Sequence, residues 1–96
     1  MNKDKIYKTI DWYGTEYQST VCMEECGELI QAISKMKRGK NNYTNLVEEM
    51  ADVLISIELL KQIYNIDDND LQGWIDFKVN RNYEKVLAAK EGADLC

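Results

Sequence analysis

The chain has 96 residues with 17 acidic and 12 basic side chains, for a net charge of -5. This length fits one domain with a modest core, so we expect a single domain over residues 1–96 that associates into a homo-oligomer. The acidic balance argues against binding a nucleic-acid polymer through phosphate neutralisation, and no apolar run is long enough to span a membrane.

Apolar residues that recur every three or four positions predict an all-helical protein, beginning with a helix from Lys3 to Tyr13. Gly14 is expected to end this helix. Thr15 and Gln18 form a capping-box pattern for a second helix, which would extend from about residue 17 to residue 36 or 37. A single helix running through Gly14 stays open as an alternative.

Residues 38–43 supply the glycine, asparagine and charge that are typical of a turn. Thr44 or Asn45 would cap a third helix, which ends near Tyr64. Because the turn is short, the second and third helices are expected to form an antiparallel hairpin.

Residues 65–69 are polar and acidic, which predicts a loop. Asp70 or a neighbour would begin a fourth apolar-periodic helix that Gly92 ends, with about residues 89–96 as a frayed tail. The expected fold is therefore an all-α, four-helix-type bundle that contains an antiparallel helical hairpin.

The two central helices are each expected to carry one apolar stripe with two acids beside it, at about 100° per residue. Glu25 and Glu28 lie beside the first stripe, and Glu49 and Asp52 lie at the same angular offset beside the second. We therefore expect these carboxylates at the rim of the buried faces. The expected core residues are Cys22, Cys26, Leu29, Ile33 and Met36 with Ile30 at their flank, and Leu46, Met50, Val53, Ile57, Leu60 and Tyr64 with Leu54 at theirs.

This arrangement comes from an acidic pattern that occurs twice, as EECGELIQAI at residues 24–33 and EEMADVLISI at residues 48–57. Either segment alone is typical of a solvated helix surface. However, no Lys or Arg lies between Glu24 and Ser34, or between Val47 and Leu60, to offset repulsion between neighbouring acids. The repetition in matching helical phase favours a functional site.

A hairpin with equivalent faces would bring the four carboxylates together, which is costly unless a cation lies between them. The sequence has no histidine, so schemes that depend on imidazole are excluded. Oxygen ligands alone select a hard divalent cation, Mg²⁺ with Mn²⁺ as a substitute, whose remaining positions accept water or phosphate oxygens. The pattern therefore predicts a site for phosphate chemistry.

These residues resemble the MazG-type, all-α nucleoside triphosphate pyrophosphohydrolases, whose motif is EExxE followed after a spacer by ExxD. EECGE at residues 24–28 and EMAD at residues 49–52 match that motif, and the similarity extends from about residue 17 to residue 83. The resemblance implies a dimer or tetramer that hydrolyses (d)NTPs to (d)NMP and pyrophosphate. It also implies four Mg²⁺ ligands, which are Glu25, Glu28, Glu49 and Asp52.

Lys78 and Asn82 match the lysine and asparagine that several relatives use, four residues apart in a later helix, to contact the phosphate or sugar of the nucleotide. Where some relatives have a basic residue after the asparagine, this chain has Tyr83. Glu24 and Glu48 precede ligand positions by one residue and are candidates for orienting a ligand or activating water, or for plain surface residues.

Lys35 and Arg38 belong to a basic cluster at the hairpin turn, within reach of a triphosphate. A basic helix C-terminus is also what the helix dipole favours, and that explanation stays open. Gln18 lies on the same helical stripe as Val21 and Glu25, which makes it a candidate for contacting a base edge.

Three cysteines, Cys22, Cys26 and Cys96, are an odd number in a chain whose N-terminal residues 1–5 lead into a polar segment. We therefore expect reduced thiols and a cytoplasmic protein. Two other functions remain open: a phosphoribosyl-ATP-type pyrophosphohydrolase with the same acids and a different pocket, and a non-catalytic helical oligomerisation or interaction module.

Overall fold

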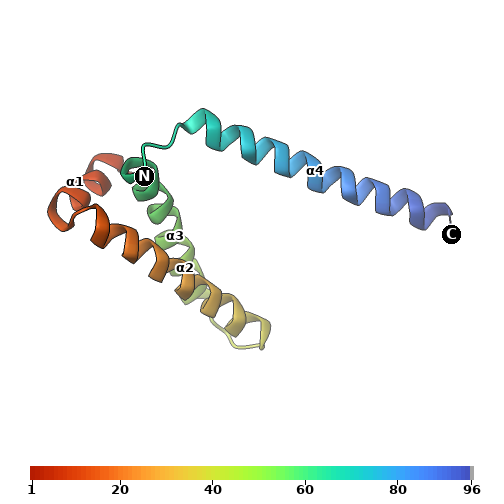
Figure 1. Cartoon of the computed structure of the whole chain (residues 1–96). Coiled ribbons are helices and arrows are strands. Elements are labelled where there is room, and N and C mark those ends of the chain that lie inside the picture. The colour runs from red at the N-terminus through yellow and green to blue at the C-terminus, as the bar shows by residue number, and fades with distance from the viewer. Residues whose placement is uncertain (96) are drawn as a thin grey trace. The chain divides into compact units, whose positions relative to one another are not determined.

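The computed structural model describes the backbone of residues 1–95 and the side-chain surroundings of residues 1–92. It contains four helices, α1 (Lys3–Tyr13), α2 (Thr15–Lys37), α3 (Tyr43–Ile63) and α4 (Asp68–Leu95), and no strand within residues 1–95 (Figure 1). The all-α prediction is confirmed. The chain divides into a compact first unit, Met1–Ile66, and a second unit, Asp67–Cys96, that carries α4.

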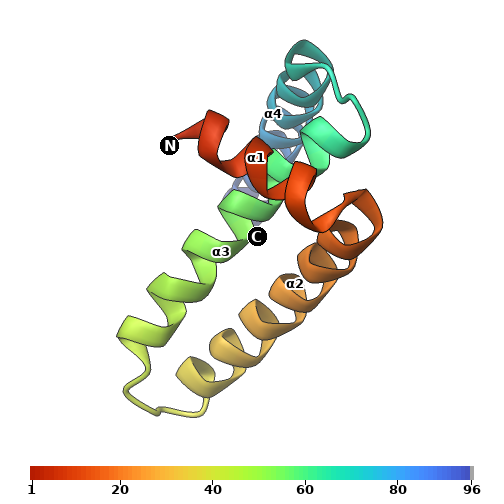
Figure 2. The same cartoon turned by 90° about the vertical axis from the view of Figure 1, so that its left-hand side faces the viewer.

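The hairpin of α2 and α3 dominates the first unit, and Figure 2 shows the two helices side by side with α1 across the end opposite their connecting turn. Gly39 has a φ of 79°, and its N–H donates to the Met36 carbonyl at 3.0 Å, which closes the end of α2. The Asn42 carbonyl accepts the first helical hydrogen bond of α3, from the Leu46 N–H at 2.9 Å. The expected cap at Thr44 or Asn45 is therefore wrong, because both residues lie inside α3.

Gly14 separates α1 from α2, as the sequence predicts. Its φ of 89° and ψ of 160° are easily reached only by glycine, and its N–H donates to the Ile10 carbonyl at 2.7 Å. The predicted capping box is wrong: Gly14 is the N-cap of α2, no side chain within the described part of the chain caps this end, and Thr15 is already helical. The side chain of Gln18 instead donates a hydrogen bond to Thr9.

In the second unit, Asp67 caps α4. Its Oδ1 accepts from the N–H groups of Asn69 at 2.7 Å and Asp70 at 3.3 Å, so Asp70 lies within the first turn of the helix. The helix continues past Gly92 to Leu95, so Gly92 does not end it. Whether residues 89–96 fray stays a prediction, and Cys96 lies outside the described residues.

The core of the first unit is small. Ile10 of α1, Cys22 of α2 and Leu59 of α3 are buried together, and the Cys22 thiol donates to the Ser56 carbonyl at 3.5 Å. Because one residue from each helix meets at this point, the cluster holds α1 on the hairpin. The side chains packed around it are those of Ile6, Tyr7, Leu60 and Ile63.

The faces that α2 and α3 turn toward each other differ from the predicted stripes. Ala32 on α2 and Glu49 and Ser56 on α3 are buried, whereas Cys26 is exposed. The contact face is therefore rotated toward the carboxylates. Glu49 is buried in the contact, whereas Glu25, Glu28 and Asp52 are half-buried or exposed at its rim, as predicted. The residues expected in the core and found exposed are Cys26, Ile30, Ile33, Met36, Met50, Leu54, Ile57 and Tyr64.

No helix in residues 1–95 is long and apolar enough to cross a membrane.

Candidate functional site

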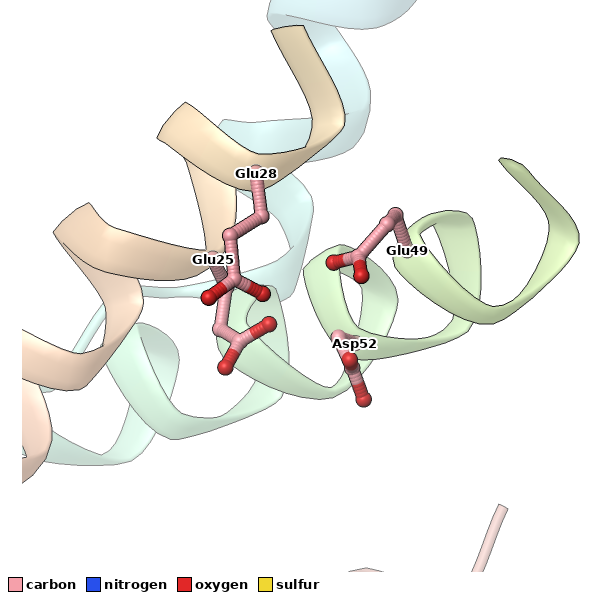
Figure 3. Close-up of side chains that lie close together, drawn as sticks. All are labelled: Glu25, Glu28, Glu49 and Asp52. Carbon is pink, nitrogen blue, oxygen red and sulfur yellow. The ribbon is translucent and has the colours of Figure 1, made fainter. Parts of the chain in front are cut away.

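Four carboxylates meet between α2 and α3. Glu25 and Glu28 are one turn apart on α2, and Glu49 and Asp52 are one turn apart on α3, so each pair occupies one side of its helix. One oxygen of each residue lies within 4.8 Å of one oxygen of each of the others. Figure 3 shows Glu25 and Glu28 on α2 facing Glu49 on α3, with Asp52 on α3 next to Glu49. We call these four residues the acid cluster.

The acid cluster is partly removed from water. Glu49 is buried, Glu25 and Asp52 are half-buried, and Glu28 is exposed. The Oε2 atoms of Glu25 and Glu49 are inaccessible to solvent and accept no hydrogen bond from the described residues. A buried carboxylate oxygen without a partner destabilises a fold. The cluster therefore has an unmet requirement for positive charge.

The same crowding shifts the acidity of two of these groups. Burial, followed by the neighbouring Asp52 and Glu28 carboxylates, raises the pKa of Glu25 from 4.5 to about 7. Burial and the adjacent Glu28 carboxylate raise the pKa of Glu49. At neutral pH the cluster therefore accepts either protons or a cation.

The donor set fits a hard divalent cation. All four groups offer carboxylate oxygen, and no nitrogen or sulfur ligand joins them among the described residues. A cation placed here would supply the positive charge that the buried oxygens of Glu25 and Glu49 lack.

Gln18 is buried and lies in a hydrogen-bonded relay on the α1 side of the hairpin. Its Nε2 donates to the Thr9 hydroxyl at 2.8 Å, and that hydroxyl donates to the Ile6 carbonyl at 2.6 Å. Because the carbonyl can only accept, the hydroxyl proton points to Ile6, and the amide nitrogen must face Thr9. Gln18 lines a cavity of about 350 Å³, to whose wall Glu25 and Asp52 also belong.

The other predicted site residues have no hydrogen bond or ion pair to the acid cluster among the described residues. Glu24 and Glu48 are exposed beside their ligand positions, and Glu48 also lines a pocket at the hairpin turn. Lys35 is half-buried near the end of α2, and Arg38 is exposed at its C-cap. Lys78 and Asn82 are exposed on α4, in the second unit.

Two residues near the site were not identified as site residues from the sequence. Asn45 donates from Nδ2 to Glu49 Oε1 at 3.4 Å, and its signal was the spacing of four residues, which places two side chains on one helix face. Thr9 has no comparable signal, because its contact with Gln18 crosses the break at Gly14.

Comparison with known proteins gives one match. The MazG nucleotide pyrophosphohydrolase domain matches residues 15–86, which include all of α2 and α3 and much of α4. No curated protein and no solved structure matches the chain. Since the match covers most of the chain, and since an all-α fold with an acid cluster on α2 and α3 accompanies it, the chain belongs to the MazG nucleotide pyrophosphohydrolase domain family.

Proposed function

We propose that this protein is a Mg²⁺-dependent hydrolase that converts (d)NTPs into (d)NMP and pyrophosphate, as part of nucleotide-pool housekeeping in the cytoplasm. The observation that carries the proposal is the acid cluster, in which four carboxylate oxygens lie within 4.8 Å of one another on the matched helices.

Glu25, Glu28, Glu49 and Asp52 are the proposed ligands, with Mg²⁺ as the ion and Mn²⁺ as a substitute. A divalent cation supplies electrostatic stabilisation of the charge that develops on the phosphates, and it orients the attacking water. Packing of α2 against α3 along the site keeps the two pairs of ligands on facing helices before any cation arrives.

The nucleoside is proposed to occupy the cavity beside the acid cluster. The wall combines apolar side chains such as Val21 and Ile55 with the polar groups of Gln18 and Lys5, a composition that suits a base and sugar. Since the relay through Thr9 fixes the amide nitrogen, the Gln18 carbonyl oxygen is the group available to accept a hydrogen bond from a base edge.

The remaining roles follow from charge and position. Glu24 and Glu48, next to ligand positions, are proposed to orient a ligand or to accept the proton of the attacking water. Lys35 and Arg38 at the hairpin end, and Lys78 and Asn82 on α4, are proposed to bind the triphosphate or sugar.

We also propose a homo-oligomer, either a dimer or a tetramer. The exposed apolar residues of α2 and α3 recur at alternating spacings of three and four, which is the pattern by which helices pack against helices. A second copy of the hairpin offers the same pattern, so two copies would cover each other's apolar stripes. The exposed residues that form the stripes are Met23, Cys26, Ile30 and Ile33 on α2, and Val47, Met50, Leu54 and Ile57 on α3.

The test is to incubate the purified protein with Mg²⁺ and a panel of NTPs and dNTPs, resolving pyrophosphate from orthophosphate. Glu49→Gln removes one ligand charge with little change in shape, so we expect turnover to fall at least about hundredfold while helicity is kept. Glu16→Gln makes the same charge change on an exposed residue in the first turn of α2 and is expected to behave like wild type.

Full activity in Glu49→Gln would reject the metal-site assignment. Turnover of phosphoribosyl-ATP without turnover of nucleoside triphosphates would replace the substrate while keeping the chemistry. Absence of metal-dependent turnover on every substrate, with Mn²⁺ also tried, would favour a non-catalytic interaction module.

A further inference from the structure

Two asparagines link the hairpin turn to the acid cluster. Asn42 Nδ2 donates to Asn45 Oδ1 at 2.9 Å, and Asn45 Nδ2 donates to Glu49 Oε1 at 3.4 Å. An ionised carboxylate can only accept hydrogen bonds, so the Asn45 group that faces Glu49 must be its NH₂. The Asn45 oxygen then faces Asn42, which must donate in turn. The orientation of both amides is thus set by Glu49.

The hydrogen bond from Asn45 makes the two oxygens of Glu49 different. Oε1 accepts from Asn45, whereas Oε2 is buried and has no hydrogen-bond partner among the described residues. Figure 3 shows the Glu49 carboxylate turned toward Glu25 and Glu28. A glutamate side chain has three rotatable bonds, and a hydrogen bond to one oxygen restricts the carboxylate to fewer orientations.

We propose that Asn45 is a positioning residue, which holds Glu49 so that its unpartnered oxygen is presented to the divalent cation, and that Asn42 orients Asn45. This inference rests on the proposed function, because it concerns the same cation. A neutral amide suits the task, since it fixes the carboxylate without neutralising the charge that the cation needs. A lysine at position 45 would compete with the cation for that charge.

The local structure of α3 supports a role beyond helix capping. Asn42 occupies the N-cap, where an asparagine side chain ordinarily accepts a hydrogen bond from the first turn. Among the described residues its side chain makes no such capping bond, and it donates to Asn45 instead. The N-cap side chain is therefore used to order the residue that contacts Glu49.

The experiment measures Mn²⁺ binding to the metal-free, full-length protein by titration calorimetry, in the absence of nucleotide. Removing a partner of a ligating carboxylate typically weakens metal affinity about ten- to hundredfold, and we expect that loss in Asn45→Ala and Asn45→Leu. Leucine keeps the branching of asparagine at Cγ, is larger, and favours helix more, so together with alanine it separates a lost hydrogen bond from unfolding. Asn42→Ala is expected to have a smaller effect, because Asn42 acts only through Asn45.

Asn41→Ala is the matched control, because Asn41 is an exposed asparagine in the same turn and its side chain has no hydrogen bond to any residue that the structure describes. It should bind Mn²⁺ like wild type. Kinetics give a second readout: in the Asn45 variants the Mg²⁺ concentration for half-maximal rate should rise about tenfold or more, while kcat at saturating Mg²⁺ stays within about threefold. A purely structural role would instead lower the melting temperature and leave metal affinity unchanged.

Wild-type Mn²⁺ affinity in both Asn45→Ala and Asn45→Leu, beside lost affinity in Glu49→Gln, would overturn the positioning role and leave the proposed function intact. Absence of Mn²⁺ binding by the wild-type protein would overturn both.

Discussion

Glu25 shows how the acid cluster couples folding to pH. Its pKa rises from 4.5 to about 7 through burial and the nearby Asp52 and Glu28 carboxylates, so the folded protein binds this proton more tightly than the unfolded chain does. At a pH between these two pKa values, the folded state therefore carries more bound protons than the unfolded chain. The free energy of unfolding contributed by this group is largest below the lower value and falls as pH rises through the higher one.

We accordingly expect the metal-free protein to lose stability between about pH 5.5 and about pH 8, measured by urea unfolding in the presence of a chelator. Glu25→Gln should weaken this dependence, since glutamine does not titrate, and Glu49, whose pKa is also raised, should keep part of it. Mg²⁺ should restore stability at the higher pH, because it binds the deprotonated cluster. A metal-free protein whose stability rises over this interval, with the same slope in Glu25→Gln, would contradict the expectation.

The meeting of the four acids could be predicted from the sequence because it depends on local periodicity. Glu25 with Glu28, and Glu49 with Asp52, share helix faces by spacing alone, and a short turn makes the helices antiparallel. The contact between Gln18 and Thr9 could not be predicted in this way, because it depends on the direction in which α1 leaves Gly14.

At the scale of helices, the packing face of the hairpin was predicted only in part. α2 carries apolar residues on two sides, with Cys22 and Ala32 buried against the hairpin and Ile30 and Ile33 exposed. A helical wheel finds both sides apolar and cannot tell which packs within the chain. The sequence therefore predicted the helices and their acidic faces, but not which apolar side packs against α3.

Leu59 is the α3 contribution to the small core that holds α1 on the hairpin. Leu59→Ala should lower the free energy of unfolding by about 2–5 kcal/mol, because it removes buried methyl groups and leaves a cavity. Urea unfolding followed by circular dichroism measures this change. Ile66→Ala, at a position that is 46% exposed, is the control and should change stability by less than about 1 kcal/mol. Equal effects of the two substitutions would argue against the α1 anchor.

Gly14 and Gly27 should respond oppositely to replacement by alanine. Gly14 has a φ of 89°, so a Cβ strains the backbone although it meets no atom of the described residues within 4 Å. We expect the free energy of unfolding to fall by about 1–3 kcal/mol. Gly27 lies inside α2 with equally open surroundings, so alanine should stabilise the helix by about 0.5–1 kcal/mol. Thermal unfolding of both variants provides the comparison. Stabilisation by Gly14→Ala would show that α1 does not turn at this residue.

At the scale of the whole molecule, α2 and α3 carry exposed apolar stripes, which the proposed oligomer would cover. Leu54 is 57% exposed at the middle of its stripe. Leu54→Glu should convert the proposed oligomer to monomer, because a buried glutamate in an apolar contact is costly. Light scattering after size-exclusion chromatography measures the mass, and Gln62→Glu, an exposed position on the same helix, is the control. A monomeric wild type at micromolar concentration would contradict the proposal.

The family and the all-α class could be predicted from the sequence, because the acidic motif and the helical period are each visible within short segments of the chain. The function of Lys78 and Asn82 has no such basis. Their spacing of four residues predicts a common face of α4, and no more. Whether this face contacts an acid cluster, in the same chain or in a second copy, depends on long-range packing, which helical periodicity does not encode.

All four members of the acid cluster come from one hairpin of one chain. The activity of mixed assemblies of wild-type and Glu49→Gln chains should therefore depend on the fraction of mutant chains in a defined way. If every chain contains a full set of ligands, an inactive chain lacks only its own site. Activity should then decline in direct proportion to the mutant fraction. If ligands were shared between chains, one defective chain would damage its neighbour's site as well, and the decline would follow a higher power.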